Sequence, residues 1–191
     1  MEHGQVGAAR MSERTAEPST AADAVRRLTH WVEDFPHSGV RFADLTPVFA
    51  DADAYRSIVD EFAARASEVD AIAAIDARGF LLGGGVGLAL GAGVVAVRKS
   101  GKLPPPVIAE SYTLEYGSST LEIPASAVDL RGKRVLVVDD VLATGGTLAA
   151  TARLIESAGA EVVGVCVVLE IAALDGRRHL EKYPLFSVST A

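Results

Sequence analysis

Two adjacent carboxylates and a short loop rich in glycine and threonine stand together in residues 135–147, Val-Leu-Val-Val-Asp-Asp-Val-Leu-Ala-Thr-Gly-Gly-Thr. The apolar start of this segment predicts a buried strand that ends at Asp139 and Asp140. The loop then predicts a helix N-terminus, where free backbone N–H groups and the positive end of the helix dipole suit a phosphate. Gly145 and Gly146 let the backbone approach a ligand, and threonine hydroxyls add donors. A phosphate loop beside carboxylates that accept hydrogen bonds from hydroxyls predicts a sugar phosphate as ligand.

Each of these features also has a simpler interpretation when it is taken alone. Asp139 and Asp140 can be a strand end and a helix N-cap, and the glycines a tight turn, but the whole run together favours a ligand site. The loop is not a Walker A motif, because no Gly-Lys-Ser/Thr follows four residues after a glycine. Residues 83–87 come close to a dinucleotide-binding fingerprint, but Leu88 stands where the third glycine is required. We interpret that run as a helix packed closely against its neighbours.

The elements that would position this segment alternate along the chain. Short apolar runs at regular intervals predict strands, and longer apolar stripes predict helices. We expect strands at residues 71–75, 94–97, 134–138 and 162–169, and helices at residues 51–68, 80–90 and 147–157. This alternation predicts an α/β fold, in which a parallel sheet is covered by helices on both faces and crossovers are right-handed. Ligands of such sheets bind beyond the carboxyl ends of the strands.

The N-terminal part of the chain is predicted in two pieces. Residues 1–19 mix small, charged and polar types without periodicity, which is typical of a disordered tail, and we expect residues 20–191 to form a single domain. A helix is expected to begin at a capping box of Thr20 and Asp23 and to end before Pro36. Its apolar face would consist of Val25, Leu28, Trp31 and Val32.

Residues 107–123 interrupt the alternation of strands and helices. They form two extended arms around Tyr116-Gly117-Ser118-Ser119, and they follow three prolines that cannot lie inside a helix. This pattern predicts a hairpin. Long excursions from compact domains often cover active sites, so we expect the hairpin to act as a lid.

Composition limits the possible functions. The 191 residues carry a formal net charge of −7, which argues against an extended surface for nucleic acid or anionic membrane. Cys166 is the only cysteine and lies in an apolar run, so it is expected to be a buried thiol rather than a nucleophile. The four histidines lack metal-ligand spacing. Without a long apolar span or a signal pattern, the expected location is the cytoplasm.

Residues 135–147 resemble the phosphoribosyl pyrophosphate signature of the type I phosphoribosyltransferases. Further stretches resemble the branch of that family that acts on adenine: Asp34-Phe35-Pro36 with residues 39–47 (Gly-Val-Arg-Phe-Ala-Asp-Leu-Thr-Pro), residues 76–80 (Asp-Ala-Arg-Gly-Phe), residues 98–104 (Arg-Lys-Ser-Gly-Lys-Leu-Pro) and residues 111–117 (Ser-Tyr-Thr-Leu-Glu-Tyr-Gly). The resemblance implies a mainly parallel central sheet flanked by helices, with a small hood and a flexible hairpin lid. It implies a homodimeric purine salvage transferase that makes AMP and pyrophosphate from adenine and phosphoribosyl pyrophosphate with Mg²⁺.

The resemblance also implies roles for individual residues. The 5-phosphate would be bound by Ala143, Thr144, Gly145, Gly146 and Thr147. The pyrophosphate would be bound by Ala77, Arg78, Gly79, Arg98, Lys99 and Lys102, with a cis peptide in the 77–79 loop. Adenine would be bound by Val40, Arg41, Phe42 and Ala43, with Phe42 stacked on the base. The catalytic residues would be Glu115, Asp139 and Asp140, with Tyr116 beside Glu115 in the lid and Mg²⁺ held mainly through the substrate.

Two departures from the family pattern concern the choice of base. The family commonly has arginine at Ala43 and proline at Ser38. A related enzyme that acts on hypoxanthine, guanine, xanthine or orotate is therefore the first alternative. The others are a regulator that senses phosphoribosyl pyrophosphate and a sugar-phosphate-binding module without catalysis. The short N-terminal tail is too small for a DNA-binding domain, which argues against the regulator.

Overall fold

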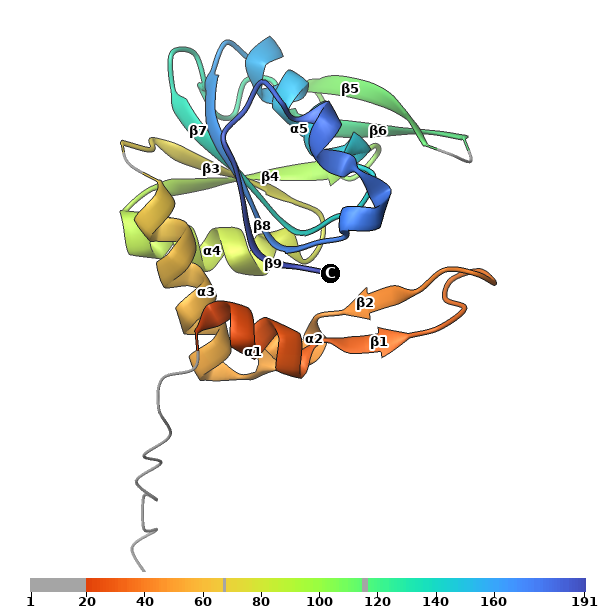
Figure 1. The fold of residues 1–191 in the computed structure, drawn as a ribbon. Coiled ribbons are helices and arrows are strands. Elements are labelled where there is room, and N and C mark those ends of the chain that lie inside the picture. The colour runs from red at the N-terminus through yellow and green to blue at the C-terminus, as the bar shows by residue number, and fades with distance from the viewer. Residues whose placement is uncertain (1–19, 67, 115–116) are drawn as a thin grey trace, which may run out of the picture.

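The computed structural model describes residues 20–66, 68–114 and 117–191, so the predicted tail at 1–19 lies outside the described residues. A seven-stranded sheet crosses the molecule in the order β5-β6-β4-β3-β7-β8-β9 (Figure 1). Its strands are β3 (Ala71–Ile75), β4 (Gly93–Lys99), β5 (Val107–Leu114), β6 (Gly117–Pro124), β7 (Arg134–Leu142), β8 (Glu161–Glu170) and β9 (Leu185–Thr190). The five strands from β4 to β9 in this order are parallel, whereas β6 is antiparallel to both β4 and β5.

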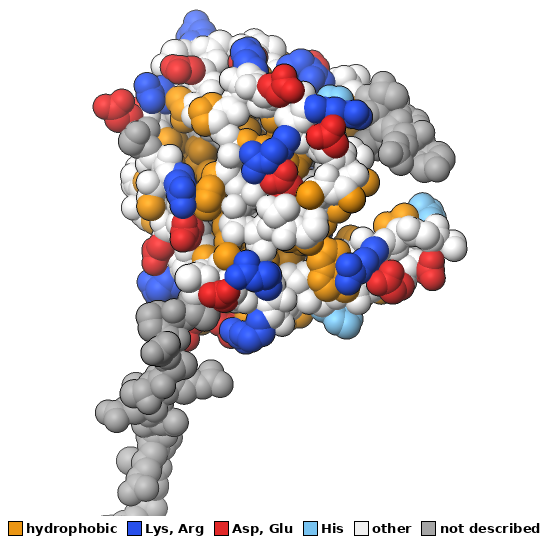
Figure 2. All heavy atoms as spheres, in the orientation of Figure 1, with side chains coloured by type: hydrophobic (Ala, Val, Ile, Leu, Met, Phe, Trp, Pro, Cys, Tyr) orange, Lys and Arg blue, Asp and Glu red, His pale blue; other side chains and the backbone are white. Residues whose placement is uncertain are grey.

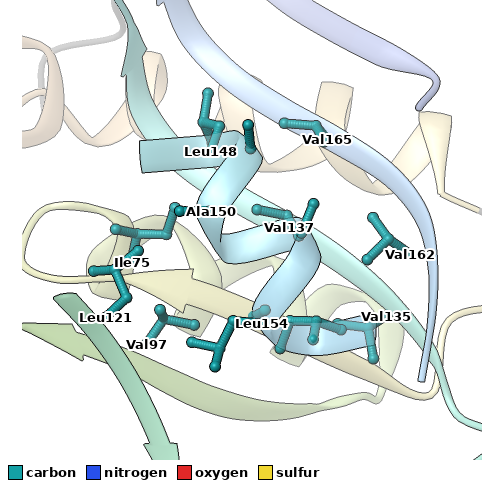
Figure 3. Close-up of a cluster of buried hydrophobic side chains, with 14 of the residues drawn as sticks. Ile75, Val97, Leu121, Val135, Val137, Leu148, Ala150, Leu154, Val162 and Val165 are labelled. Atoms are coloured by element: carbon teal, nitrogen blue, oxygen red, sulfur yellow. The ribbon is translucent and has the colours of Figure 1, made fainter. Parts of the chain in front are cut away.

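Helices cover both faces of this sheet, as the alternation of apolar segments predicts. Helix α5 (Gly146–Ser157) packs on one face, and α3 (Ala52–Arg65) and α4 (Gly79–Leu90) pack on the other (Figure 1). Figure 3 shows the α5 side of the core, where Leu154 of α5 lies among sheet side chains such as Val97 and Val137. Successive side chains of a strand point to opposite faces, which is why Ile75 belongs to this cluster and Ile72 to the other.

Helix α4 confirms the interpretation of the glycine-rich run as a site of close packing. A Cβ atom on Gly83 would lie 2.5 Å from the Cβ of Ala74 in β3, and one on Gly85 would lie 2.7 Å from the Tyr55 hydroxyl in α3. The small residues therefore let α4 approach both the sheet and α3. Within the described ranges, none of the helices is both long and apolar enough to cross a membrane.

A small N-terminal lobe extends beyond the sheet, as the resemblance implied for a hood. It consists of α1 (Ala21–Leu28), β1 (His30–Val32), β2 (Phe42–Asp44) and α2 (Thr46–Ala50). Strands β1 and β2 pair antiparallel, and their ribbon projects on the same side of the molecule as the β5–β6 hairpin (Figure 1). The side chain of Thr20 accepts a hydrogen bond from the Asp23 N–H at 3.1 Å, which confirms the predicted N-cap.

The first helix is shorter than the sequence predicted. It ends at Leu28, because Thr29 has an extended backbone and its hydroxyl donates to the carbonyl of Val25. Trp31 and Val32, which the helical spacing placed in the same helix, instead lie in β1, and Trp31 pairs with Ala43 of β2. Pairing with a segment distant in sequence thus overrides the local helical spacing.

The remaining elements agree with the sequence in part. The predicted hairpin at 107–123 is confirmed as β5 and β6, and helix α3 ends three residues before the predicted bound. The C-terminal region adds elements that the sequence did not predict, namely β9 and the 3-10 turns η1 (Ala172–Leu174) and η2 (Gly176–His179). Figure 2 shows acidic and basic side chains interspersed over the face in view rather than gathered into one basic surface.

The parallel strands direct the chemistry-bearing residues to one edge of the sheet. Four strands carry these residues at their carboxyl ends: residue 76 follows β3, residue 99 ends β4, residues 139–142 end β7, and residue 170 ends β8. Because these strands are neighbours and run in the same direction, residues far apart in sequence meet at this edge.

Candidate functional site

The two carboxylates lie inside β7, because that strand continues to Leu142 rather than ending at residue 138. Asp140 is 7% exposed, and its Oδ2 lies 2.5 Å from the Nε of Arg78. The backbone N–H of Asp140 donates to Oδ1 of Asp139 at 2.9 Å. The pair is therefore held at a fixed orientation, with one arginine against its buried member.

Burial and mutual repulsion change the acidity of this pair. Burial, followed by the nearby charge of Asp140, raises the pKa of Asp139 well above its usual range. Burial also raises the pKa of Asp140, although the Arg78 guanidinium opposes that shift. Groups at functional sites often have such shifted pKa values. A ligand that brings cations or hydroxyl donors to this point would favour the ionised form of both carboxylates.

The loop at residues 143–147 leads directly into α5, as predicted. Gly145 is the N-cap and has φ +82°, a conformation that glycine adopts without steric cost. The first backbone N–H groups of a helix have no partner inside the helix, so they remain available to a phosphate. The hydroxyls of Thr147 and Tyr112 lie 3.1 Å apart, which connects this loop to strand β5 of the hairpin.

The loop at residues 76–79 connects β3 to α4 opposite the carboxylate pair. The Asp76–Ala77 peptide bond is cis, in agreement with the expectation for this loop. A Cβ atom on Gly79 would lie 2.9 Å from the carbonyl oxygen of Val138 and 3.1 Å from Oδ1 of Asp139. Glycine at this position therefore allows the start of α4 to lie directly against Val138 and Asp139 of β7.

The other predicted basic residues lie at the end of β4 and just after it. Arg98 is paired with Asp76, with 3.2 Å between Nε and Oδ2, so its guanidinium holds the 76–79 loop. Lys99 faces the cavity described below, and Lys102 is exposed in the following turn. Buried Glu122 fixes the start of that turn, because it accepts hydrogen bonds from the Ser100 hydroxyl and from the Gly101 N–H at 3.0 Å.

A cavity of about 360 Å³ brings the main groups together. Its predicted members are Ala77, Arg78, Lys99, Asp139, Asp140 and Thr147. Its further members, which sequence reasoning missed, are Ile75, Asp76, Tyr112, Ser119 and Leu121. In the sequence, Asp76 follows the predicted strand at 71–75 just as Asp139 follows the predicted strand at 134–138, so the same signal could have identified it. Thr144 and Gly146 instead line a second hollow of about 660 Å³ on the α5 side, and Tyr112 borders both.

The predicted base-binding residues lie around β2. The ring of Phe42 lies 5.4 Å from the Cζ of Arg78, and its edge meets Phe35 with 5.1 Å between the ring centroids. Phe42 is half-buried rather than a core residue, which leaves one side of it accessible. Ala43 is 6% exposed, whereas Val40 is exposed at the start of this segment.

Arg41 does not supply the charge that is missing at Ala43. Its guanidinium lies over the Trp31 ring at 4.2 Å and pairs with Glu33 at 3.0 Å. Phe42, its neighbour, contacts Arg78 instead. Only the backbone of Arg41 therefore remains as a candidate for base contacts.

Glu115 and Tyr116 lie outside the described residues. Across the described ranges, three or more His, Cys, Asp or Glu side chains do not come together as a metal cage. Mg²⁺ commonly keeps several waters and binds through one or two carboxylates and substrate phosphates. The paired Asp139 and Asp140 beside a phosphate loop fit an ion that enters with its substrate.

Comparison with known proteins gives one consistent result. The family model of the phosphoribosyl transferase domain matches residues 50–190. The curated adenine phosphoribosyltransferase of Rhodococcus jostii is 72% identical over 172 residues, which are 90% of this chain and 97% of that protein. A crystal structure of adenine phosphoribosyltransferase from Thermoanaerobacter pseudethanolicus has a TM-score of 0.83 at 43% identity, covering 87% of this chain and 98% of that one. The Saccharomyces cerevisiae enzyme, solved with adenine and an imino-altritol bisphosphate, has a TM-score of 0.81 at 36% identity, covering 88% and 98%.

Proposed function

Because the chain belongs to the phosphoribosyl transferase family, we propose that its site performs the reaction of its adenine-specific relatives. The chain transfers a phosphoribosyl group from phosphoribosyl pyrophosphate to adenine and releases AMP and pyrophosphate. The observation that carries this conclusion is the 360 Å³ cavity, in which a pair of carboxylates, an arginine, a lysine and a phosphate-loop threonine meet at one sheet edge. The sequence identity of 72% to a curated adenine phosphoribosyltransferase supports adenine as the base.

The carboxylate pair faces the ribose in this proposal. Asp139 and Asp140 accept hydrogen bonds from the ribose hydroxyls, while the N-terminus of α5 and Thr147 hold the 5-phosphate. Cleavage of the anomeric C–O bond runs ahead of formation of the C–N bond, so positive charge develops on the ribose. Negative potential from the two aspartates stabilises that charge, and a covalent protein intermediate is not required.

The departing pyrophosphate meets the basic side of the same cavity. Arg78 and Lys99 line it, with a fork of donors on Arg78 and a mobile point charge on Lys99. When Mg²⁺ is bound it adds positive charge to the diphosphate, and Asp139 and Asp140 are the carboxylates that would hold it or its waters. Arg98 contributes indirectly, because its ion pair with Asp76 fixes the position of the 76–79 loop.

Adenine lies against Phe42 in this proposal. The half-buried ring offers a stacking face next to Arg78, and backbone groups of residues 40–43 supply hydrogen bonds to the base. Glu115, which follows β5 in the sequence, assists removal of the proton from adenine N9, and Tyr116, the next residue, closes the lid.

A second copy of this chain is the partner that we propose. Apolar side chains are exposed on α4 and at the adjoining start of β4: Leu81 at 54%, Leu88 at 87% and Val94 at 46%. Leu81 and Leu88 are seven residues apart and so lie on the same side of α4; exposed apolar residues that share one side favour association, and most oligomers of soluble proteins are symmetric homodimers. The molar mass measured by light scattering tests this, with twice 19.9 kDa expected and a single-chain mass contradicting it.

A panel of bases tests the reaction and its specificity. The purified chain, phosphoribosyl pyrophosphate and Mg²⁺ are mixed with adenine, hypoxanthine, guanine, xanthine or orotate, and initial rates of nucleotide formation are compared. Adenine is expected to react fastest. A faster rate with another base would identify a related transferase, and binding of phosphoribosyl pyrophosphate without product from any base would identify a sensor or binding module.

A further inference from the structure

The phosphate loop, residues 143–147, packs against residues 171–179, which contain η1 and η2. The proposed mechanism does not use this second segment. The carbonyl oxygen of Gly176, in η2, lies directly behind Gly145, where a Cβ atom would collide with it. In return, a Cβ atom on Gly176 would collide with the carbonyl oxygen of Ala143 and would lie 3.0 Å from the nitrogen of Gly145. Two backbones thus cross at a distance that only paired glycines allow, although the residues are 31 positions apart.

Steric space, rather than backbone conformation, requires glycine at position 176. The positive φ of +82° belongs to Gly145, whereas Gly176 has no such value. Gly176 is buried, and its Cβ atom would also lie 2.8 Å from the Cδ1 of Leu142 at the end of β7. An alanine at 176 therefore has to displace the loop, because its backbone neighbours are not flexible side-chain ends.

An ion pair between a half-exposed arginine and a buried carboxylate holds the crossing in place. Arg177, the next residue, donates from Nε to Oε1 of Glu170 at 2.7 Å and from Nη2 to the Ser187 hydroxyl at 3.2 Å. Ser187 in turn donates to Oε2 of Glu170 at 2.9 Å. Glu170 is 6% exposed, and although burial works to raise its pKa, the hydrogen bonds from Arg177 and Ser187 leave that pKa below its usual value.

The contacts of Arg177 with Glu170 and Ser187, which we call the anchor, connect this segment to the strands of the sheet. Glu170 ends β8 and Ser187 lies in the neighbouring β9, so Arg177 spans the two strands at the edge of the sheet. The N–H of Ile171 also donates to the carbonyl of Leu142 at 2.9 Å, which joins the start of the segment to the end of β7. The phosphate loop is therefore held between β7 on one side and the anchored segment on the other.

We propose that Gly176 and Arg177 are positioning residues that set the phosphate loop at the correct depth for the 5-phosphate of the ribosyl substrate. The proposal rests on the proposed function, because it takes the loop at 143–147 as the phosphate site. Backbone donors bind an anion well only when they are held in place before it arrives, and a misplacement of about 1 Å can reduce activity by roughly a hundredfold. The anchored segment prevents such a shift.

The first test uses Gly176→Ala, with Gly164→Ala as the matched control. A Cβ atom on Gly164, in β8, would meet its nearest neighbours at 3.4 and 3.5 Å, so this substitution adds a methyl group without displacing the loop. Titration calorimetry measures the affinity of each full-length protein for ribose 5-phosphate and, separately, for adenine. Gly176→Ala is expected to weaken ribose 5-phosphate binding at least about tenfold and to leave adenine binding within about twofold, whereas the control keeps both.

The second test removes the anchor without adding volume at the crossing. Arg177→Met is expected to raise the KM for phosphoribosyl pyrophosphate at least about fivefold more than the KM for adenine, and Arg177→Lys is expected to restore part of that difference. Arg131→Met is the control, because Arg131 also pairs with a neighbouring carboxylate, that of Asp129, but is largely exposed. If Gly176→Ala does not fold, this comparison decides the proposal.

The outcomes separate the two claims. If the unmodified chain does not bind ribose 5-phosphate, the assignment of the phosphate loop fails and the proposed function fails with it. If the unmodified chain binds it but the folded Gly176→Ala and Arg177→Met proteins bind it equally well, only the positioning role is overturned. A uniform loss of affinity for ribose 5-phosphate and adenine would likewise overturn it, since that result indicates general destabilisation.

Discussion

The pair formed by Arg78 and Asp140 offers a test in which stability reports directly on the geometry of the site. Its atoms Nε and Oδ2 lie 2.5 Å apart, and the side chains are 32% and 10% exposed. We consider Arg78→Met, Asp140→Asn and the double variant. Arg78→Met leaves a buried carboxylate without its cation and next to Asp139, whereas Asp140→Asn removes the charge that the arginine balances.

The expected loss of stability in Arg78→Met follows from the distance between the two charges and from the burial of their side chains. Two unit charges whose centres are ~4 Å apart attract each other by about 4 kcal/mol at an effective dielectric constant of about 20. Because about a third of the Arg78 side chain is exposed, solvent screening reduces this to about 2 kcal/mol. Arg78→Met should therefore lower the free energy of unfolding by about 2 kcal/mol and the melting temperature by about 4–8 °C for a chain of this size. Asp140→Asn should cost less, since it also relieves the repulsion with Asp139.

Thermal and urea denaturation of all four proteins at pH 7, followed by circular dichroism, measures the coupling between the two residues. We expect a coupling free energy of about 2 kcal/mol, so that Asp140→Asn partly rescues the stability of Arg78→Met. Additive effects, with coupling under about 0.5 kcal/mol, would show that the pair is solvated and would refute the argument from burial.

Further predictions concern the same cavity and the core. Replacing Asp139 and Asp140 together by asparagine should lower turnover at least about tenfold, or about 1.4 kcal/mol in the transition state, with an unchanged far-ultraviolet spectrum; an unchanged rate would remove the role given to the pair. Because the folded protein raises the pKa of Asp139, it binds that proton more tightly than the unfolded chain, so stability should fall as pH rises from about 4 through the folded-state pKa. Urea denaturation across pH should show a smaller decline for Asp139→Asn, in which only the raised pKa of Asp140 remains, and parallel profiles would contradict the shift. Burial raises the pKa of Cys166 to about 12, so a thiol reagent at pH 8 should react with it only after denaturation. Reaction of the native protein would show that the thiol is accessible. Chelation with EDTA should abolish turnover, and Mg²⁺ should restore it; full activity in excess EDTA would exclude the proposed ion.

The regular part of the fold was predictable because it depends on local pattern. The strands near residues 71–75 and 162–169 have apolar runs of the correct length, and the loop at 143–147 has both the glycines and the hydroxyls of a helix-terminal phosphate site. The sequence alone could therefore locate the polar residues that the reaction needs at the carboxyl ends of the strands.

The rest depends on contacts between distant segments. Trp31 followed a helical spacing, but its strand pairs with β2, and single-sequence patterns do not specify partners. Gly145 was predicted to approach a ligand, and the structure shows that it also crosses the backbone of Gly176. The ion pair of Arg78 with Asp140 joins segments 62 positions apart, so neither residue could identify the other in the sequence.

The stoichiometry of the reaction tests the central claim most directly. The full chain is incubated with Mg²⁺, adenine and phosphoribosyl pyrophosphate, and AMP and pyrophosphate are quantified together over the initial phase. The account predicts one AMP and one pyrophosphate for each adenine consumed. Pyrophosphate release without AMP, or unchanged adenine alongside intact phosphoribosyl pyrophosphate, would contradict it.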